Sequence, residues 1–260
     1  MANIAQLSRF ANTIADMNLE DVERAHRLPS SLLLAQDADL AVYYAPFEYV
    51  NPQARVAIVG ITPGFTQAIN ALREAQSQLR KGASHAAATQ AAKETGAFSG
   101  SMRSALIAML NHCGVQRWLG LSTCEELFSS KRHLLHTTSV LSNPVFVGTA
   151  NYNGTPSMVR HPLLQRQLIE GFGQDTQRLS SAVYLPLGDK VAEALHFLAK
   201  RGCLREEQIL DGMPHPSGAN AERIAYFLGN KARAALSSKT NPDKLDRART
   251  ALQSRVAALA

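Results

Sequence analysis

Two patterns of hydrophobic and polar positions alternate along the chain. Short apolar, β-branched runs occupy residues 55–60, 133–140 and 182–188, with a weaker one at 208–213. The first three runs lack polar–apolar alternation along much of their length, which is typical of strands covered on both faces. Between the runs, apolar residues recur at helical spacing. This spacing predicts helices over residues 66–80, 101–112, 163–172, 189–201 and 219–236.

The order of these elements predicts an α/β fold. Strands that alternate with helices form a parallel sheet with helices on both faces. The Ala-rich residues 83–92 predict a surface helix or a mobile insertion. A final helix starts at Asn241, a capping residue followed by proline at the first helical position. We therefore expect a helical extension over residues 1–50, one α/β/α domain over 51–236, and a basic amphipathic helix within 237–260.

Composition narrows the class of protein. The 260 residues are 45% hydrophobic and 18% charged, which excludes a disordered chain. Three Cys residues are too few for a disulfide framework, and no apolar run is long enough to cross a bilayer. The N-terminal residues lack the basic start and the unbroken apolar stretch of a secretion signal. We expect a monomeric cytoplasmic protein that has no membrane partner.

The net charge of +6 is distributed unevenly. Residues 1–130 carry a net charge of −1, whereas residues 131–260 carry +7. A basic half suggests an anionic partner, with nucleic acid as the first candidate. A solvated surface with excess Lys and Arg explains the same numbers, so charge alone does not decide between the two.

Gly, Pro and small polar residues follow each predicted strand. In open α/β sheets the ligand binds outside the carboxyl ends of the strands. The loop at residues 60–64 lacks the spacing of a known phosphate-binding motif, and taken alone it is a turn. The loop at residues 215–218 is more specific, because it places an imidazole, a hydroxyl and backbone N–H groups at the start of a helix. A lone His215 is also compatible with a structural role.

These loops together resemble motifs of the uracil-DNA glycosylase superfamily. Residues 60–64, Gly-Ile-Thr-Pro-Gly, resemble its first motif and most closely the Gly-Ile-Asn-Pro-Gly of the mismatch-specific enzymes. Residues 213–220, Met-Pro-His-Pro-Ser-Gly-Ala-Asn, resemble its last motif. Residues 94–106 are similar to a Phe-containing segment of the iron–sulfur-type enzymes, and residues 183–188 occupy the place of the third strand. The resemblance covers about residues 55–235.

The resemblance implies a fold and a reaction. The fold is a three-layer α/β/α sandwich on a four-stranded parallel sheet of order 2-1-3-4. The reaction is that of a DNA glycosylase, which flips a nucleotide out of double- or single-stranded DNA. The enzyme hydrolyses the N-glycosidic bond through an oxocarbenium-like cation and leaves an abasic site. No cofactor or metal is expected: the iron–sulfur branch needs four Cys ligands, and Cys113, Cys124 and Cys203 are scattered and one short.

Site residues are carried over from the motifs one by one. Thr62 occupies the position of the family's water-positioning Asp or Asn, and His215 that of its catalytic His. Phe98 matches the aromatic that stacks on the base, with Phe65 as the alternative. The remaining base-pocket positions are Gly60, Ile61, Pro63, Gly64, Thr138, Ser139 and Asn143. The positions that would hold DNA are Ser217, Gly218, Ala219, Asn220 and Arg223.

Departures from the family pattern alter the expected substrate. Thr62 lacks a carboxylate and at most orients water. The Asn that reads uracil is replaced by Thr138 or Ser139, with Asn143 close by, and Ala219 is too small to fill the space left by a flipped base. Small side chains favour a larger, modified pyrimidine, such as the modified cytosines of some viral DNA, and therefore antiviral defence rather than repair. Two alternatives stay open: a DNA-binding member without catalysis, and a nucleoside hydrolase.

Two carboxylates are candidates for the missing base. Glu48 lies in an aromatic cluster just before the first strand, near the amino end of that strand, which favours packing. Glu94 precedes Phe98 but fits a surface position at a helix end.

Overall fold

The structure is a computed structural model that describes residues 4–96 and 101–259. The fold is mixed α/β, and the chain divides into two compact units. Unit 1 comprises Met1–Val50, Gly60–Ala97 and Thr138–Arg178, and unit 2 comprises Asn51–Val59, Phe98–Thr137 and Leu179–Ala260. Each unit has an apolar core of its own. Within the described residues, no helix combines the length and the apolar character that crossing a membrane requires.

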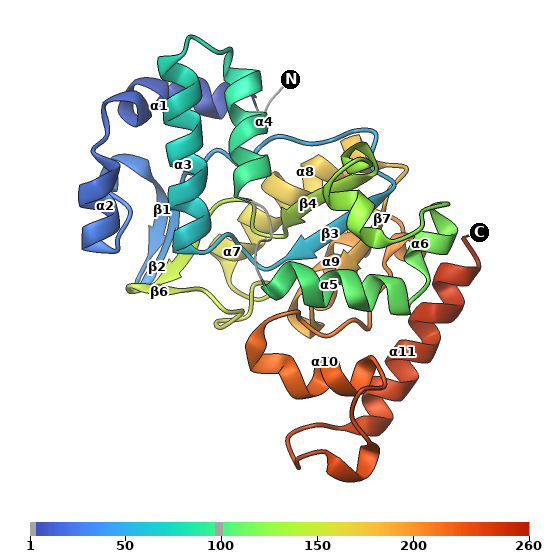
Figure 1. Cartoon of the computed structure of the whole chain (residues 1–260). Coiled ribbons are helices and arrows are strands. Elements are labelled where there is room, and N and C mark those ends of the chain that lie inside the picture. Colours follow the sequence, from blue (N-terminus) through green and yellow to red (C-terminus); the bar gives the residue numbers. More distant parts are fainter. Residues whose placement is uncertain (1–3, 97–100, 260) are drawn as a thin grey trace. The chain divides into compact units, whose positions relative to one another are not determined.

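Four helices of unit 1 pack around one of these cores. They are α1 (Ile4–Asp16), α2 (Leu19–Ala25), α3 (Phe65–Arg80) and α4 (His85–Thr95). Figure 1 shows α3 and α4 side by side and α1 next to them. The prediction of a helix over residues 66–80 is confirmed by α3. The Ala-rich segment is also a helix, and its residues Ala88 and Ala92 are fully buried because small side chains allow close packing.

Unit 1 also contains an antiparallel sheet that the sequence did not predict. Its order is β1 (Leu33–Asp37), β2 (Leu40–Tyr43), β5 (Val145–Val147) and β6 (Ala150–Asn151). The extension predicted as helical over residues 1–50 therefore contains α1 and α2 but also two strands, so the prediction is wrong for residues 33–43. β2 obtains its second partner, β5, from about a hundred residues further along the chain. Local hydrophobic periodicity cannot detect such pairing, because the strands are short and their partners are distant.

The segment predicted as a helix over residues 163–172 is helical but irregular. It begins as α7 (Pro162–Gln167), continues as a π-helical turn over Leu168–Phe172, and ends in the short α8 (Gly173–Asp175). Asp175 is buried at the end of this run. A π-helical turn shifts the following side chains relative to a regular α-helix.

The parallel sheet has the order β4-β3-β7. These strands are β3 (Val56–Gly60), β4 (Leu135–Ser139) and β7 (Val183–Pro186), so the first three predicted strands are confirmed. Every residue of β3 and β7 is buried, as their uninterrupted apolar character indicated. At the position of the expected fourth strand, the described chain forms an isolated parallel bridge between Ile209 and Tyr184. The four-stranded order 2-1-3-4 is thus not confirmed.

The other helices of unit 2 surround its apolar core. They are α5 (Ser101–His112), α6 (Val115–Trp118), α9 (Asp189–Ala199), α10 (Ala221–Phe227) and α11 (Pro242–Ala257). α11 begins after the predicted cap, since the side chain of Asn241 accepts from the backbone N–H of Lys244 at 3.0 Å. Leu252 and Val256 of α11 are buried in the core, so this helix packs on unit 2.

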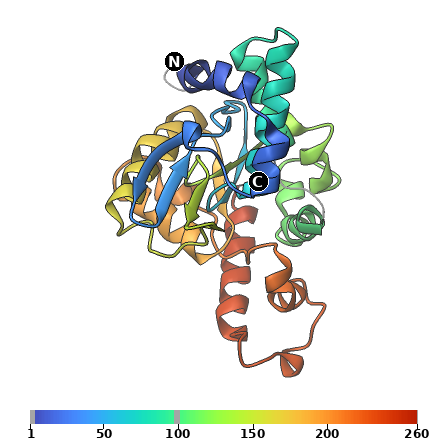
Figure 2. The same cartoon turned by 90° about the vertical axis from the view of Figure 1, so that its left-hand side faces the viewer.

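The helix predicted over residues 219–236 is much shorter than expected. α10 ends at Phe227, and Gly229 adopts φ +81°, a conformation that stops a helix and suits glycine. Residues 228–241 then form a return loop that leads to α11. Figures 1 and 2 both show α10 and α11 side by side, joined by this loop.

Gly212 fixes how closely α11 approaches the segment that leads to His215. Its φ is +110°, and a Cβ atom there would lie 2.9 Å from the backbone oxygen of Ala248 in α11. Only glycine fits this close approach without displacing the helix.

Candidate functional site

The predicted base-pocket residues of unit 1 lie on two loops that hydrogen bonds hold together. The backbone N–H of Val140 donates to the oxygen of Gly60, and that of Leu141 donates to the oxygen of Ile61, both at 3.0 Å. These bonds continue the pairing beyond the carboxyl ends of β3 and β4. The loops at residues 60–65 and 140–145 are therefore joined at the carboxyl ends of β3 and β4, the edge at which open α/β sheets bind ligands.

Thr62 joins these two loops through its hydroxyl group. Its Oγ1 donates to the backbone oxygen of Asn143 at 2.9 Å and accepts from the backbone N–H of Val145 at 3.1 Å. The hydroxyl hydrogen is therefore committed to Asn143, and one acceptor lone pair remains. In unit 1 this residue fixes the conformation of the loop that carries Asn143.

Replacing Thr62 by valine is expected to lower the free energy of unfolding by about 1–3 kcal/mol, because it leaves two part-buried backbone groups without their partner. Thr62→Ser keeps the hydroxyl and should lose much less. Urea denaturation of the three proteins measures the difference. Equal stability of the valine variant and the wild type would contradict the role of the Thr62 hydroxyl in joining the two loops.

Phe65 is part of the packed core of unit 1. Its side chain is 4% exposed, and its ring centroid lies 4.2 Å from that of His26. The backbone N–H of Phe65 donates to Oδ1 of Asn151 at 2.9 Å, which fixes the start of α3. Pro63 is likewise buried, while Gly64 is half-buried. Phe98, the other predicted stacking residue, lies outside the described residues.

The three polar candidates near β4 differ in their surroundings. Thr138 is buried, and its hydroxyl accepts from Nζ of Lys93 at 3.5 Å. Ser139 and Asn143 are half-buried. In the described part of the chain, the side-chain amide of Asn143 forms no hydrogen bond, so both its donor and its acceptor can face a ligand.

Next to Thr138, unit 1 contains a cluster of buried ionisable side chains. Nζ of Lys93 donates to the backbone oxygen of Phe47 at 2.7 Å. Oε1 of Glu48 accepts from the hydroxyl of Tyr44 at 2.8 Å and from the backbone N–H of Leu7 at 3.1 Å. Oε2 of Glu48 is buried and accepts no hydrogen bond from the described residues. Glu48 is 8% exposed. The residue for which the sequence favoured a packing role therefore carries a buried carboxyl group.

Burial dominates the pKa of each member of this cluster. It raises the pKa of Glu48 to about 7, although the hydrogen bond from Tyr44 and the charge of Lys93 favour the carboxylate. It lowers the pKa of Lys93 to about 8, opposed by the charges of Asp175 and Glu48. Two groups that titrate near neutral pH beside a strand end are typical of a functional site.

Sequence reasoning did not single out Lys93 or Asp175. Helical spacing does contain a signal for Lys93, because Ala88, Thr89 and Ala92 share its buried face on α4. A lysine on the apolar side of a helix needs a partner, and the partners Glu48 and Asp175 are far away in the sequence.

The predicted catalytic residue His215 lies in unit 2. Nδ1 of His215 accepts from the backbone N–H of Ser217 at 3.2 Å. In the neutral ring the hydrogen must therefore reside on Nε2. Partial burial lowers the pKa of His215, which keeps the ring neutral at physiological pH. Unit 2 thus presents a neutral imidazole with one N–H donor.

A chain of hydrogen bonds extends from this loop into α10. Nδ2 of Asn220 donates to Oγ of Ser217 at 3.2 Å. Nη1 of Arg223 donates to Oδ1 of Asn220 at 3.2 Å, and Nη2 donates to the backbone oxygen of Lys239 at 3.3 Å. Gly218 and Ala219, at the start of the turn, are exposed.

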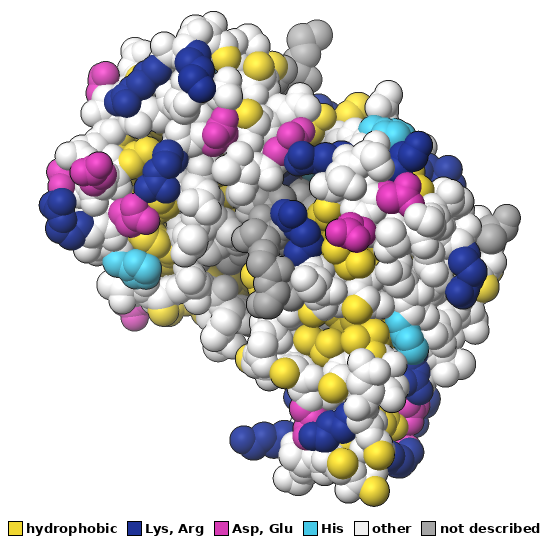
Figure 3. Space-filling view, viewed as in Figure 1, with side chains coloured by type: hydrophobic (Ala, Val, Ile, Leu, Met, Phe, Trp, Pro, Cys, Tyr) yellow, Lys and Arg dark blue, Asp and Glu magenta, His cyan; other side chains and the backbone are white. Residues whose placement is uncertain are grey.

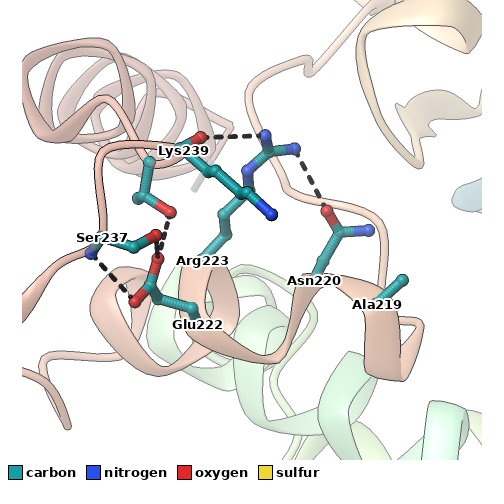
Figure 4. A pocket seen from close by; sticks show the side chains of 7 residues that line it. Ala219, Asn220, Glu222, Arg223, Ser237 and Lys239 are labelled. Carbon is teal, nitrogen blue, oxygen red and sulfur yellow. Dashed lines mark hydrogen bonds between the residues drawn. The ribbon is translucent and has the colours of Figure 1, made fainter.

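Of these residues, Ala219, Asn220, Arg223 and Lys239 border a pocket of about 370 Å³ in unit 2 (Figure 4). Its walls come from the start of α10 and from the return loop, and its lining residues are Ala219, Asn220, Glu222, Arg223, Ser237, Lys239 and Thr240. Ala219, Asn220 and Arg223 are among the predicted DNA contacts. Ser237, Lys239 and Thr240 are not, because they lie beyond the matched motifs, in the segment 237–260 that is predicted to form the C-terminal helix.

The structure therefore divides the predicted residues into two sets. Unit 1 brings together the positions on the 60–65 and 138–143 segments, and unit 2 brings together the positions from 215 to 223. Among the described residues, no group of three or more His, Cys, Asp or Glu side chains has a geometry that would hold a metal ion.

Comparison with known proteins identifies one relative with substantial coverage. The chain is 36% identical over 225 residues to a protein of Bacillus subtilis (strain 168) described as the uncharacterized protein YoxB. The aligned residues cover 82% of this chain and 88% of that protein. No family profile matches the chain, and no solved structure matches it.

Proposed function

The chain belongs to the YoxB family, and from the chemistry of its own residues we propose that it is a DNA glycosylase. The proposed enzyme hydrolyses the N-glycosidic bond of a flipped, modified pyrimidine and leaves an abasic site. This assignment rests on the motif resemblance to the uracil-DNA glycosylase superfamily and on the geometry of the loop at residues 215–223.

The observation that carries the proposal is the state of His215. A departing pyrimidine takes the electron pair of the broken bond and becomes an anion. A neutral imidazole that donates from Nε2 can stabilise that anion by a hydrogen bond. The bond from the Ser217 N–H to Nδ1 and the lowered pKa of His215 both favour this tautomer.

The bond changes of the reaction follow directly. The bond between C1′ of the sugar and the ring nitrogen breaks, and both electrons leave with the base. Water adds to the oxocarbenium carbon and releases a proton, and the base anion is protonated to give the free base. By the resemblance, Thr62 helps to hold the water through its remaining lone pair, and Asn143 reads the base with its unengaged amide.

The finer fold assignment belongs to the same proposal. In the sheet order 2-1-3-4, residues 208–213 would occupy the fourth position. The parallel bridge between Ile209 and Tyr184 supports this, as does the hydrogen bond of 2.8 Å from the Leu210 N–H to the oxygen of Tyr184. The fourth strand would then end just before the loop of His215.

The substrate follows from side-chain size. Thr62 stands where the superfamily has a larger Asp or Asn, and Ala219 stands where the superfamily has a larger wedge residue. A pocket with smaller side chains favours a pyrimidine that carries an additional group, such as hydroxymethylated or glucosylated cytosine. Such bases belong to some viral genomes, so the proposed role is antiviral defence.

The test is an excision assay on duplexes that contain uracil, thymine opposite guanine, or hydroxymethylated or glucosylated cytosine. Alkali then cleaves the strand at any abasic site. We expect breaks with a modified cytosine and few with uracil. DNA binding without breaks would replace the proposal with a non-catalytic DNA-binding protein. Release of a base from free nucleosides alone would replace it with a nucleoside hydrolase.

A further inference from the structure

The return loop of unit 2 is fastened to α10 by a single carboxylate. Glu222 accepts hydrogen bonds from Nζ of Lys231 at 2.8 Å, from the backbone N–H of Ser237 at 3.1 Å, and from the hydroxyls of Ser237 and Thr240, both at 2.6 Å. These bonds, the one from Lys231 foremost, hold the pKa of Glu222 well below its usual range. Figure 4 shows Glu222 turned toward Ser237 and away from Arg223.

This fastening makes the loop a fixed wall of the 370 Å³ pocket. Thr240, the last loop residue before the cap of α11, is buried, whereas Lys239 next to it is exposed. The side chain of Lys239 is therefore presented from an anchored backbone. Because Arg223 donates to the backbone oxygen of Lys239, the two cationic residues are held at the same pocket.

The charges at this pocket are not balanced within the described chain. Among the described residues, the guanidinium of Arg223 donates only to neutral oxygen atoms, those of Asn220 and Lys239. The ammonium of Lys239 has no hydrogen bond or ion pair with any described residue. The one lining carboxylate, Glu222, is already paired with Lys231.

Neighbouring cations of the same region differ from this pair. Arg233 pairs with Asp243 at 2.7 Å, and Lys244 pairs with Asp189. Figure 3 shows Lys and Arg side chains interspersed with Asp and Glu side chains over α10, the return loop and the start of α11. Arg247 of α11 is also exposed and has no hydrogen bond or ion pair with a described residue, but it does not line the pocket. Among the residues that line the pocket, the positive charge that remains for a ligand is therefore located at Arg223 and Lys239.

We propose that this pocket binds a backbone phosphodiester of the nucleic acid strand, with Arg223 and Lys239 as its ligands. The inference rests on the proposed function for the choice of a nucleic acid. A volume of about 370 Å³ admits a phosphate with an attached sugar. The hydrogen bonds from Arg223 through Asn220 to Ser217 connect the pocket to the loop of His215. Lys239 thereby adds to the predicted DNA contacts a residue that lies beyond the matched motifs.

The test compares the salt dependence of binding for the wild type, Lys239→Ala and Lys200→Ala. Lys200 is the matched control, because it is also exposed, belongs to unit 2 and has no described side-chain partner. It caps the carboxyl end of α9, whereas the amino end of that helix is the end near His215, since a Cβ atom at Gly188 would lie 3.7 Å from Cβ of His215. Fluorescence anisotropy would measure affinity for duplex DNA, single-stranded DNA and RNA of one sequence between about 50 and 200 mM salt.

We expect Lys239→Ala to reduce the slope of log affinity against log salt concentration by about 1, as the loss of one phosphate contact does. Lys200→Ala should leave the slope unchanged, and Lys239→Glu should weaken binding further. A loss shared by all three nucleic acids supports a phosphodiester ligand, and a loss confined to one of them supports a phosphodiester of that nucleic acid. Thermal melting of each variant establishes that the fold is retained.

Two results would overturn the inference: an unchanged slope for Lys239→Ala, or an equal reduction for Lys200→Ala. A Lys239 effect seen only with vesicles of anionic phospholipid would also overturn it, in favour of a membrane surface. Failure of the proposed function looks different. If the protein excises no base but shows the Lys239 effect, the phosphodiester pocket is supported and the glycosylase proposal is refuted. If the protein excises a base but lacks the Lys239 effect, the glycosylase proposal is supported and the pocket inference is refuted.

Discussion

Replacing His215 by alanine should slow base release roughly 100-fold, the effect of removing one hydrogen-bond donor to a developing anion. The affinity for DNA should change little, because His215 contributes no formal charge when neutral. Single-turnover excision gives the rate, and anisotropy gives the affinity. The rate should fall more than the affinity because the hydrogen bond from Nε2–H to the base strengthens only as the base acquires negative charge.

His215→Gln is the matched variant for this experiment. Its amide keeps an N–H donor on a side chain of similar length, so the excision rate should lie between those of the wild type and the alanine variant. Equal losses of rate and affinity in His215→Ala would instead assign His215 to the structure of its loop. Acidification provides a second check. Because burial lowers the pKa of His215, protonation occurs only below its ordinary range and then places a hydrogen on Nδ1, facing the Ser217 N–H.

Replacing Glu48 by glutamine should make the protein relatively more stable as the pH rises. The raised pKa of Glu48, about 7 against an ordinary 4.5, means that the folded state binds this proton more tightly than the unfolded state. Its contribution to stability is therefore complete below pH 4.5 and is lost as the pH rises through about 7. Over that window the wild type should lose at most about 3 kcal/mol relative to Glu48→Gln.

The glutamine variant is expected to fold because its carbonyl oxygen can keep the bonds from Tyr44 and Leu7. Urea denaturation at pH 4.5, 6 and 8 measures the difference in the free energy of unfolding. Glu20→Gln is the control, since Glu20 is exposed and lies in the same unit. A difference between Glu48→Gln and the wild type that stays constant across this pH range would show that folding does not raise the pKa of Glu48.

Some features of the chain follow from local sequence alone. The strands at 56–60 and 183–186 are uninterrupted apolar runs, and such runs are stable only when both faces are covered. The start of α11 follows from Asn241 and the proline after it. The Nδ1 contact of His215 is also local, because its partner is two residues away.

The tertiary structure determined what depends on distant residues. β2 and β5 pair across about a hundred residues, so the antiparallel sheet has no local signature. Lys93 and Glu48 acquire near-neutral pKa values only because folding buries both in one cluster. Lys239 lines the same pocket as Arg223 because Gly229 stops α10 and Glu222 fastens the returning chain. The sequence determined the strand ends and the His215 loop because short-range sterics and hydrogen bonds set them. Burial and the pairing of charges are properties of the whole fold, and only the fold could decide them.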